Sequence, residues 1–208
     1  MTILFDLDGT LIDSTDAILE SFEVAYEAFG EAAPETEDIK SLIGYPLDIM
    51  LAKLGVKGDT QCYIDAYKKH YRMISGSKTT LLPLAREAIE EAARFAKLGI
   101  VTTKTSMYSK ELLEQMDVMH YFDVLIGRDC VQNPKPHPEP IHKAMKSLDA
   151  SYESAWMIGD TILDLNSATS AGIKSVGVLC GYGKKIDLLK HTEFIEDNSF
   201  DAVKLINR

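Results

Sequence analysis

The sequence has few cysteines and no apolar run long enough to cross a membrane. Among its 208 residues are three cysteines, Cys62, Cys130 and Cys180, which lie far apart and have no close histidine or cysteine neighbours. This pattern argues against a zinc site and a disulfide framework, and it favours a reducing compartment. No basic segment precedes the first apolar run at Ile3, so we expect a cytoplasmic protein without a membrane anchor.

Positive charge is also scarce. The chain has 22 Lys and Arg against 32 Asp and Glu, which gives a formal net charge of −10. A nucleic-acid partner needs clustered Lys and Arg to displace counterions, so this balance argues against one. A small anionic substrate is still compatible with it. Charges more than about 8 Å apart are largely screened at physiological salt, and a few local cations can therefore dominate a pocket.

The first third of the chain has a helical pattern. Apolar residues recur at helical spacing between Asp13 and about Ser77, and glycines or prolines separate the segments. The predicted helices are Asp13–Phe29, Pro34–Leu42, Leu47–Leu54 and Asp59–Ile74. The stripe of Tyr63, Tyr67 and Tyr71 on the last of them is more typical of a core than of a ligand site.

Strands alternate with helices in the rest of the chain. The predicted strands are Leu98–Thr103, Phe122–Gly127, Ala155–Gly159 and Ser175–Leu179, and the predicted helices are Leu84–Lys97, Ser106–Met119, Pro138–Leu148 and Ile162–Ala171. Segments Ile186–Lys190 and Phe194–Ile195 complete the alternation. This order predicts an α/β fold with a doubly wound parallel sheet and right-handed crossovers. The apolar run Ile3–Phe5 belongs to the same sheet, so the helical block is an insertion after the first strand.

Polar side chains follow four of the predicted strands. They are Asp6 and Asp8 after the first strand, Thr102, Thr103 and Lys104 after the second, Lys135 beyond the third, and Asp160 and Asp164 after the fourth. Ligands of open parallel sheets bind outside the carboxyl ends of the strands, so we expect these side chains at one rim. Such convergence favours a functional site over scattered surface polarity.

These residue types suit phosphoryl chemistry. The four aspartates offer the oxygen ligands that Mg²⁺ prefers, and Lys135 and Thr102 can hold phosphate oxygens. An ionised aspartate is a nucleophile without a helper base, so Asp6 can attack phosphorus in line to give an aspartyl phosphate. Asp8 can then protonate the leaving oxygen and later deprotonate the hydrolytic water.

The motifs Asp6-Leu7-Asp8-Gly9-Thr10, Thr102, Lys135-Pro136 and Gly159-Asp160-Thr161-Ile162-Leu163-Asp164 resemble, in order, the four motifs of the haloacid-dehalogenase superfamily. The resemblance implies a Rossmann-like core at residues 1–14 and 81–208, an all-helical cap at residues 15–80, and Mg²⁺ as cofactor. It implies Asp6 as nucleophile, Asp8 as acid and base, and Thr102 and Lys135 as phosphoryl ligands. The metal would be held by Asp6, the Asp8 carbonyl and Asp160, with Asp164 in support or acting through water.

Within this superfamily, the second aspartate indicates phosphoryl transfer, because the dehalogenating members lack it. The segments Ile43–Leu47, Lys135–Pro140 and Gly181–Gly183 resemble phosphoglycolate phosphatases and related inorganic pyrophosphatases, although Thr103 stands where such members commonly have asparagine. The implied partner is a small phosphorylated metabolite, and we expect a monomer or homodimer. The expected substrate-binding residues are Thr103, Lys104, Gly44 and Tyr45.

Several alternatives stay open at this point. The chain could be a pyrophosphatase or nucleotidase of the same family, or a β-phosphoglucomutase-like mutase, although it lacks the basic cap loop usual in those mutases. A non-catalytic binding protein would be expected to lose motif residues, and none is lost here. Tyr45 either reaches the substrate or packs within the cap. His137 either positions Lys135 or caps the helix that begins near Pro138.

Overall fold

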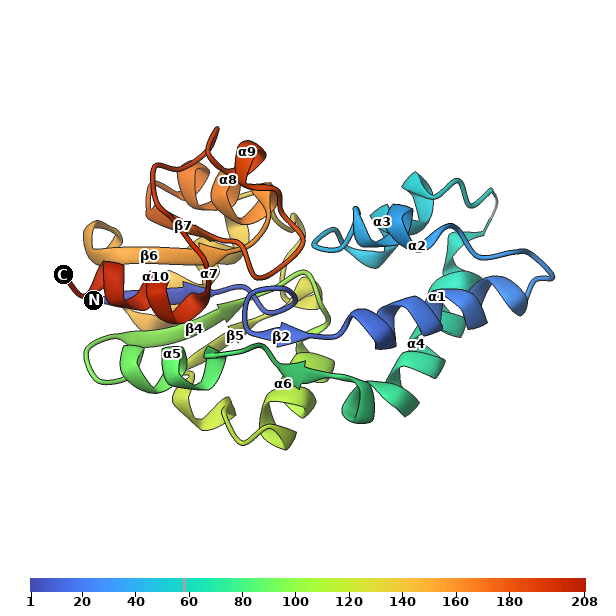
Figure 1. Cartoon of the computed structure of the whole chain (residues 1–208), viewed down its shortest axis with the longest axis horizontal. Helices are drawn as coiled ribbons and strands as arrows, with labels where there is room; N and C mark the ends of the chain where they lie inside the picture. The colour runs from blue at the N-terminus through green and yellow to red at the C-terminus, as the bar shows by residue number, and fades with distance from the viewer. Residues whose placement is uncertain (58) are drawn as a thin grey trace.

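The computed structural model describes residues 1–57 and 59–208. Figure 1 shows a sheet with helices on both faces and, beside it, a group of helices formed by α1 to α4. Both chain termini lie at the end of the sheet that is far from this group. None of the helices in the described ranges is both long and apolar enough to span a lipid bilayer.

Within the described residues, six parallel strands form the main sheet in the order β5-β4-β1-β6-β7-β8. Their bounds are β1 Thr2–Phe5, β4 Lys97–Val101, β5 Val124–Ile126, β6 Ala155–Gly159, β7 Lys174–Val178 and β8 Ile195–Glu196. The chain builds the sheet outward from β1 on one side and outward from β6 on the other. This confirms the predicted α/β fold with a doubly wound parallel sheet, and it places the topological switch point between β1 and β6.

Alternating side chains of β1 supply both faces of the sheet. Ile3 and Phe5 are buried in one core, which includes residues of α5 (Ala85–Ala92), α6 (Ser106–Gln115) and α10 (Ser199–Ile206). Leu4 is buried in the opposite core with residues of α7 (Glu139–Leu148) and α8 (Ile162–Ala171). Burial on both faces explains why the strand is a short continuous apolar run, and it holds the end of β1 in a fixed place.

The helices α1 (Thr15–Glu27), α2 (Thr36–Lys40), α3 (Leu47–Lys53) and α4 (Thr60–Lys78) form what we call the helical lobe. They surround a core of their own that is rich in aromatic residues. The ring of Tyr67 lies between those of Phe22 and Tyr71, with centroid distances of 5.1 Å and 5.7 Å. The tyrosine stripe of α4 therefore packs in a core. The predicted domain boundaries after residues 14 and 80 stay a prediction.

Several predicted helices are shorter than the sequence indicates, and two of them show a physical reason. The helix predicted at Leu84–Lys97 begins at Ala85, because Leu84 has a left-handed φ of 63°, and it ends at Ala92 before Lys97 pairs with β1. The helix predicted at Ser106–Met119 ends at Gln115, and Asp117 has a φ of 54°. A left-handed residue cannot continue an α-helix, and apolar periodicity does not reveal it.

Several short elements were not predicted. An antiparallel pair, β2 (Ile12–Asp13) and β3 (Thr80–Leu81), joins the two chain segments that lead into and out of the helical lobe. Helix α10 begins where the side chain of Asn198 accepts a hydrogen bond from the Asp201 amide at 3.0 Å. The 3-10 turns Met119–Tyr121, Arg128–Cys130 and Tyr152–Ser154 were not predicted either. Helix α9 (Lys185–Leu188) overlaps the predicted segment Ile186–Lys190. Two-residue strands are too short to show a period of two.

Candidate active site

Three aspartates meet at the switch point of the sheet. Asp6 follows β1, and its amide donates to the carbonyl of Ile158 in β6 at 2.9 Å. Asp160 follows β6, and Asp164 lies in the first turn of α8. Each carboxylate offers an oxygen within 4.8 Å of the other two, and all three residues are buried. The sheet topology thus brings together two motifs that are about 150 residues apart in the chain.

Neighbouring groups hold two of these carboxylates in place. Asp164 closes a capping box with Thr161, whose amide and hydroxyl donate to Oδ2 at 3.0 Å and 2.6 Å. Asp160 accepts from the Thr10 hydroxyl at 2.9 Å and from the Tyr182 amide at 2.8 Å. Gly9 has a φ of +81°, and a Cβ there would lie 2.4 Å from Asp160 Oδ2. The Asp-Gly-Thr sequence therefore leaves room for Asp160 and supplies it with a donor.

The electrostatics of this acidic cluster favour a cation. Burial, the nearby Asp164 and, less strongly, Asp8 raise the pKa of Asp6 to about 7, although Lys135 acts in the opposite direction. Burial and the charges of Asp164 and Asp6 raise the pKa of Asp160 well above its usual range. Like charges in a dry site destabilise each other unless a cation or a proton compensates them. A donor set of carboxylate oxygens alone fits a hard divalent cation.

Lys135 is the cation that the chain itself provides to the cluster. It is 3% exposed, and its ammonium group contacts Asp6 Oδ1 at 2.8 Å, Asp164 Oδ1 at 2.5 Å and the Val101 carbonyl at 2.9 Å. Burial lowers the pKa of Lys135, but its two acidic neighbours outweigh that effect and leave the pKa above its ordinary value. All three ammonium protons thus have an acceptor, and the side chain is fixed beside Asp6.

Thr102 lies at the end of β4, next to β1 in the sheet. It is buried, its amide donates to the Ile126 carbonyl at 2.9 Å, and its hydroxyl oxygen accepts from the Lys104 amide at 3.1 Å. These bonds tie the loop after β4 to the neighbouring strand β5. The predicted rim of strand ends is therefore present at β1, β4 and β6.

The side chain of Asp8 lies outside the acidic cluster. Its Oδ1 accepts a hydrogen bond from the Ser14 hydroxyl and lies 3.2 Å from Lys104 Nζ, which also donates to the Tyr71 hydroxyl at 2.9 Å. Burial lowers the pKa of Lys104, but the attraction of Asp8 and the nearby Tyr71 and Tyr67 leaves it raised overall. Lys104 therefore stays charged and links Asp8 to α4 of the helical lobe.

The helical lobe contacts the sheet at Gly44. The Thr103 hydroxyl donates to the Gly44 carbonyl at 2.9 Å. Gly44 has a φ of +105°, and a Cβ there would lie 2.9 Å from Thr161 Cγ2. Both the backbone conformation and the close approach therefore require glycine. Gly44 and Thr103, which the sequence assigns to substrate binding, are in contact with each other across the two parts of the molecule.

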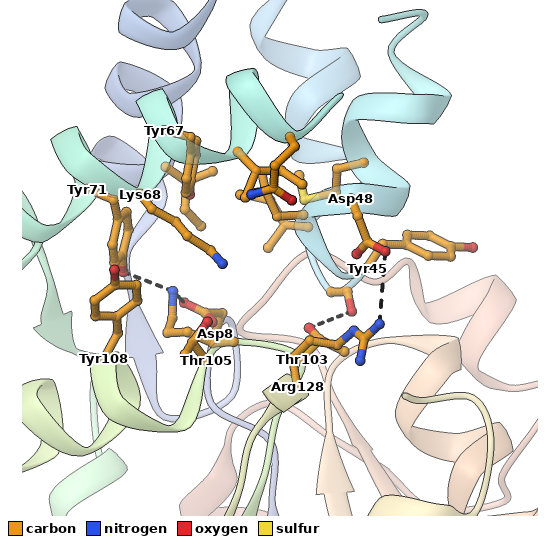
Figure 2. A pocket seen from close by; sticks show the side chains of 18 residues that line it. Asp8, Tyr45, Asp48, Tyr67, Lys68, Tyr71, Thr103, Thr105, Tyr108 and Arg128 are labelled. Atoms are coloured by element: carbon orange, nitrogen blue, oxygen red, sulfur yellow. Dashed lines mark hydrogen bonds and ion pairs between the residues drawn. The ribbon is translucent and has the colours of Figure 1, made fainter. Parts of the chain in front are cut away.

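The sequence leaves two roles open for each of Tyr45 and His137. The ammonium group of Lys53 lies 4.9 Å from the ring centroid of Tyr45. Figure 2 shows the Tyr45 ring pointing away from Lys68. Tyr45 nevertheless lines the cavity described below. The ring Nδ1 of His137 accepts from the Glu139 amide at 3.1 Å, so His137 binds the first amide of α7, although the N-cap residue itself is Pro138. Its ring is exposed, while Lys135 is buried.

A cavity of about 320 Å³ lies beside Asp8, between the sheet and the helical lobe. Figure 2 shows the side chains around it. The wall on the sheet side includes Asp8, Thr103, Lys104, Thr105, Tyr108 and Arg128, and the opposite wall includes Ile18, Ile43, Tyr45, Asp48, Tyr67, Lys68 and Tyr71. The cavity thus combines an apolar surface from the helical lobe with charged groups from both sides.

Sequence reasoning missed several residues of this region. Arg128 lies two residues after the end of β5 and directly after the predicted strand Phe122–Gly127, so the rule that identified the other strand-end residues also applies to it. Lys68 lies four residues after Ile64 and three before Tyr71, which is the spacing of one helix face, and all three line the cavity. Thr10 and Tyr182 lie in quoted motifs, and only the structure shows that both bind Asp160.

Comparison with known proteins identifies the family. Residues 3–178 match the family model described as haloacid dehalogenase-like hydrolase. The chain is 30% identical to a phosphoglycolate phosphatase of Aquifex aeolicus over 99% of this chain and 96% of the relative. It is 34% identical to the pyrophosphatase PpaX of Bacillus cereus over 85% of this chain and 82% of the relative.

A solved structure agrees with these relatives. A haloacid dehalogenase-like hydrolase from Bacteroides fragilis superposes with a TM-score of 0.91 at 26% identity, covering 97% of this chain and 98% of that one. The predicted enzyme class, a phosphoric monoester hydrolase of this superfamily, is confirmed by the family match and the named relatives. The chain belongs to the haloacid dehalogenase-like hydrolases.

Proposed function

We propose that the protein is a Mg²⁺-dependent phosphatase that hydrolyses a small phosphorylated metabolite through an aspartyl phosphate on Asp6. The observation that carries this proposal is the buried meeting of Asp6, Asp160 and Asp164 with Lys135 at the switch point of the sheet. The named relatives, a phosphoglycolate phosphatase and a pyrophosphatase, support it. The division into a core at residues 1–14 and 81–208 and a cap at residues 15–80 is part of the same proposal.

The acidic cluster is the proposed metal site. Asp6, Asp160 and Asp164 would hold Mg²⁺ together with the backbone carbonyl of Asp8. The bound ion would supply positive charge that offsets the repulsion between Asp6 and a phosphate dianion. The raised pKa values of Asp6 and Asp160 support this assignment, because burial and the neighbouring carboxylates both disfavour the charged forms, and a bound cation would offset both effects.

Asp6 is the proposed nucleophile. The ammonium group of Lys135, 2.8 Å from Asp6 Oδ1, orients the carboxylate and favours its ionised, nucleophilic form. The same positive charge would attract the incoming phosphoryl group, and Thr102 at the neighbouring strand end would donate to one of its oxygens. In-line attack would then transfer the phosphoryl group to Asp6 and release the leaving-group oxygen.

Asp8 is the proposed general acid and base. It lines the cavity, so a leaving group that occupies the cavity would place its oxygen near the Asp8 carboxyl. Ser14 and Lys104 hold this carboxyl in position. Asp8 would donate a proton to the leaving oxygen and then take a proton from the water that hydrolyses the aspartyl phosphate.

The cavity supports a small substrate. Its volume of about 320 Å³ is at the lower end of the range for ligand pockets, roughly 300–1,000 Å³. 2-Phosphoglycolate and pyrophosphate are the two candidates that the named relatives favour. Thr103, Lys104, Gly44 and Tyr45 would form part of this substrate site. A phosphosugar mutase would isomerise a hexose phosphate without net phosphate release.

The test is a phosphatase screen with Mg²⁺ across small phosphate esters, pyrophosphate and an aryl phosphate. We expect phosphate release that EDTA abolishes and that excess Mg²⁺ restores. The variant Asp6→Asn should lose turnover by at least about a thousandfold, because it removes the nucleophile while keeping the shape of the side chain. Circular dichroism should show that this variant keeps its fold. Full activity in EDTA, or in Asp6→Asn, would contradict the mechanism.

A further inference from the structure

The cavity beside Asp8 contains charged groups that the proposed reaction does not use. Of the charged side chains that line it, Asp8 and Lys104 pair with each other at 3.2 Å. The others are Lys68 and Asp48 from the helical lobe and Arg128 from the loop after β5. Two cations and one anion of the cavity lining therefore have no role in the proposed reaction, with Lys68 and Asp48 on the helical-lobe wall and Arg128 on the sheet-side wall.

Lys68 projects into the cavity from α4. Figure 2 shows its ammonium group pointing into the space between the helical lobe and the strand ends. The residue is half-buried, and among the described residues its ammonium group has no hydrogen-bond or ion-pair partner. A partly desolvated lysine that points into a hollow is an available binding group for an anion.

Arg128 approaches the cavity from the opposite wall. One guanidinium nitrogen donates to the Val131 carbonyl at 3.2 Å, and the other lies 4.0 Å from Asp48 Oδ2. The side chains of Arg128 and Asp48 are 34% and 47% exposed, so this long contact contributes little stability. A guanidinium group has five N–H donors, so Arg128 keeps free donors for a ligand while its bond to Val131 holds it in place.

We propose that Lys68 and Arg128 bind a second anionic group of the substrate. The substrate class is then a small phosphate compound with a further negative charge, such as a carboxylate or a second phosphate, at the end remote from the transferred phosphoryl group. This inference rests on the proposed function, because it takes the transferred phosphoryl group to lie beside Asp6 and Lys135. Asp48 weakens the attraction of an anionic group to this part of the cavity. The net charge of Lys68, Arg128 and Asp48 is still positive, so a phosphate ester with an ammonium group would be repelled.

The test compares compounds that differ mainly in the second group. The anionic compounds are 2-phosphoglycolate and pyrophosphate, and the references are 2-hydroxyethyl phosphate and 2-aminoethyl phosphate. The measured quantity is the specificity ratio, the kcat/KM of the better anionic compound divided by that of the hydroxyl ester. For the wild-type protein we expect a ratio above about ten, with the ammonium ester slowest, because a partly buried charge contact contributes about a factor of ten or more.

Three variants and one control locate the effect. Lys68→Met and Arg128→Met keep side-chain length and remove charge, and each should lower the specificity ratio about tenfold, mainly through the KM of the anionic compound. Asp48→Asn should raise the ratio, because it removes a competing acid and frees Arg128. The matched control is Lys69→Met, whose exposed side chain lies next to Lys68 on α4 and is not part of the cavity wall. It should leave the ratio unchanged.

The outcomes separate the two proposals. A wild-type ratio near one, or Lys68→Met and Arg128→Met ratios equal to that of Lys69→Met, would overturn this inference and leave the phosphatase proposal intact. A lower ratio in Asp48→Asn would also overturn it. If the wild-type protein with Mg²⁺ released phosphate from none of the compounds, the proposed function would fail and this inference would fail with it.

Discussion

The acidic cluster and the cavity beside it are built from contacts of very different kinds. In the cluster, Lys135 is almost fully buried and touches three acceptors at 2.5–2.9 Å. In the cavity, Lys68 has no partner within the described residues, and Arg128 meets Asp48 only at 4.0 Å. We infer that the cluster fixes the reaction, which has one geometry, whereas the cavity wall selects the substrate and can differ without disturbing the fold.

The largest contrast is expected on replacing one lysine from each region. Lys135→Met leaves Asp6 and Asp164 buried without their cation, which should cost about 3 kcal/mol of the free energy of unfolding in the absence of Mg²⁺. It should also reduce turnover by at least about a hundredfold. Lys68→Met removes an unpaired, half-buried charge and should change the free energy of unfolding by less than about 0.5 kcal/mol. Urea unfolding at pH 8 measures both.

Either of two results would contradict the expected difference between Lys135→Met and Lys68→Met. Equal destabilisation by the two substitutions would mean that Lys135 does not compensate the acidic cluster. A stable and fully active Lys135→Met protein would remove Lys135 from the proposed mechanism.

A smaller effect is expected from pH and Mg²⁺, and it should be confined to the acidic cluster. Without metal, Asp6 and Asp160 bind protons more tightly in the folded protein than in the unfolded chain. The pKa of Asp6 in the folded protein is about 7, and that of Asp160 is well above its usual range. An ordinary aspartate has a pKa of about 3.9. The stability from this tighter proton binding is therefore fully present below about pH 4 and is lost as the pH rises towards 7. Mg²⁺ should raise Tm, and more at pH 8 than at pH 5.

The control for this effect is Asp160→Asn, which should abolish most of the Mg²⁺-dependent increase in Tm. Differential scanning calorimetry with and without Mg²⁺ at the two pH values measures it. An increase of the same size at pH 5 and pH 8, or one that persists in Asp160→Asn, would show that Mg²⁺ stabilises the protein elsewhere.

The sequence predicts the acidic cluster better than the cavity, for a physical reason. In a parallel sheet, residues that follow the strands must converge, so Asp6, Thr102 and Asp160 can be brought together from the strand pattern alone. The strand β6 and the helix α8 have the predicted bounds, because Gly159 and Gly172 punctuate strong apolar patterns. The strand pattern and the glycines that end these elements are therefore enough to predict where the aspartates lie.

The cavity depends on how the helical lobe sits against the sheet. Lys68 belongs to a helix whose pattern indicates only which face is apolar, and the contact between Arg128 and Asp48 joins residues 80 positions apart. The bond from Thr103 to Gly44 has the same character. No propensity or motif encodes such contacts, so the sequence left the role of Tyr45 open and did not identify either cation.

The central claim is that the acidic cluster transfers a phosphoryl group to Asp6. The most direct measurement is acid quenching of the protein during turnover with Mg²⁺ and substrate, followed by mass spectrometry of its peptides. We predict one added phosphoryl group on the peptide that contains Asp6, and none on that peptide in Asp6→Asn. A phosphoryl group on another residue, or undiminished turnover by Asp6→Asn with no modified peptide, would contradict the claim.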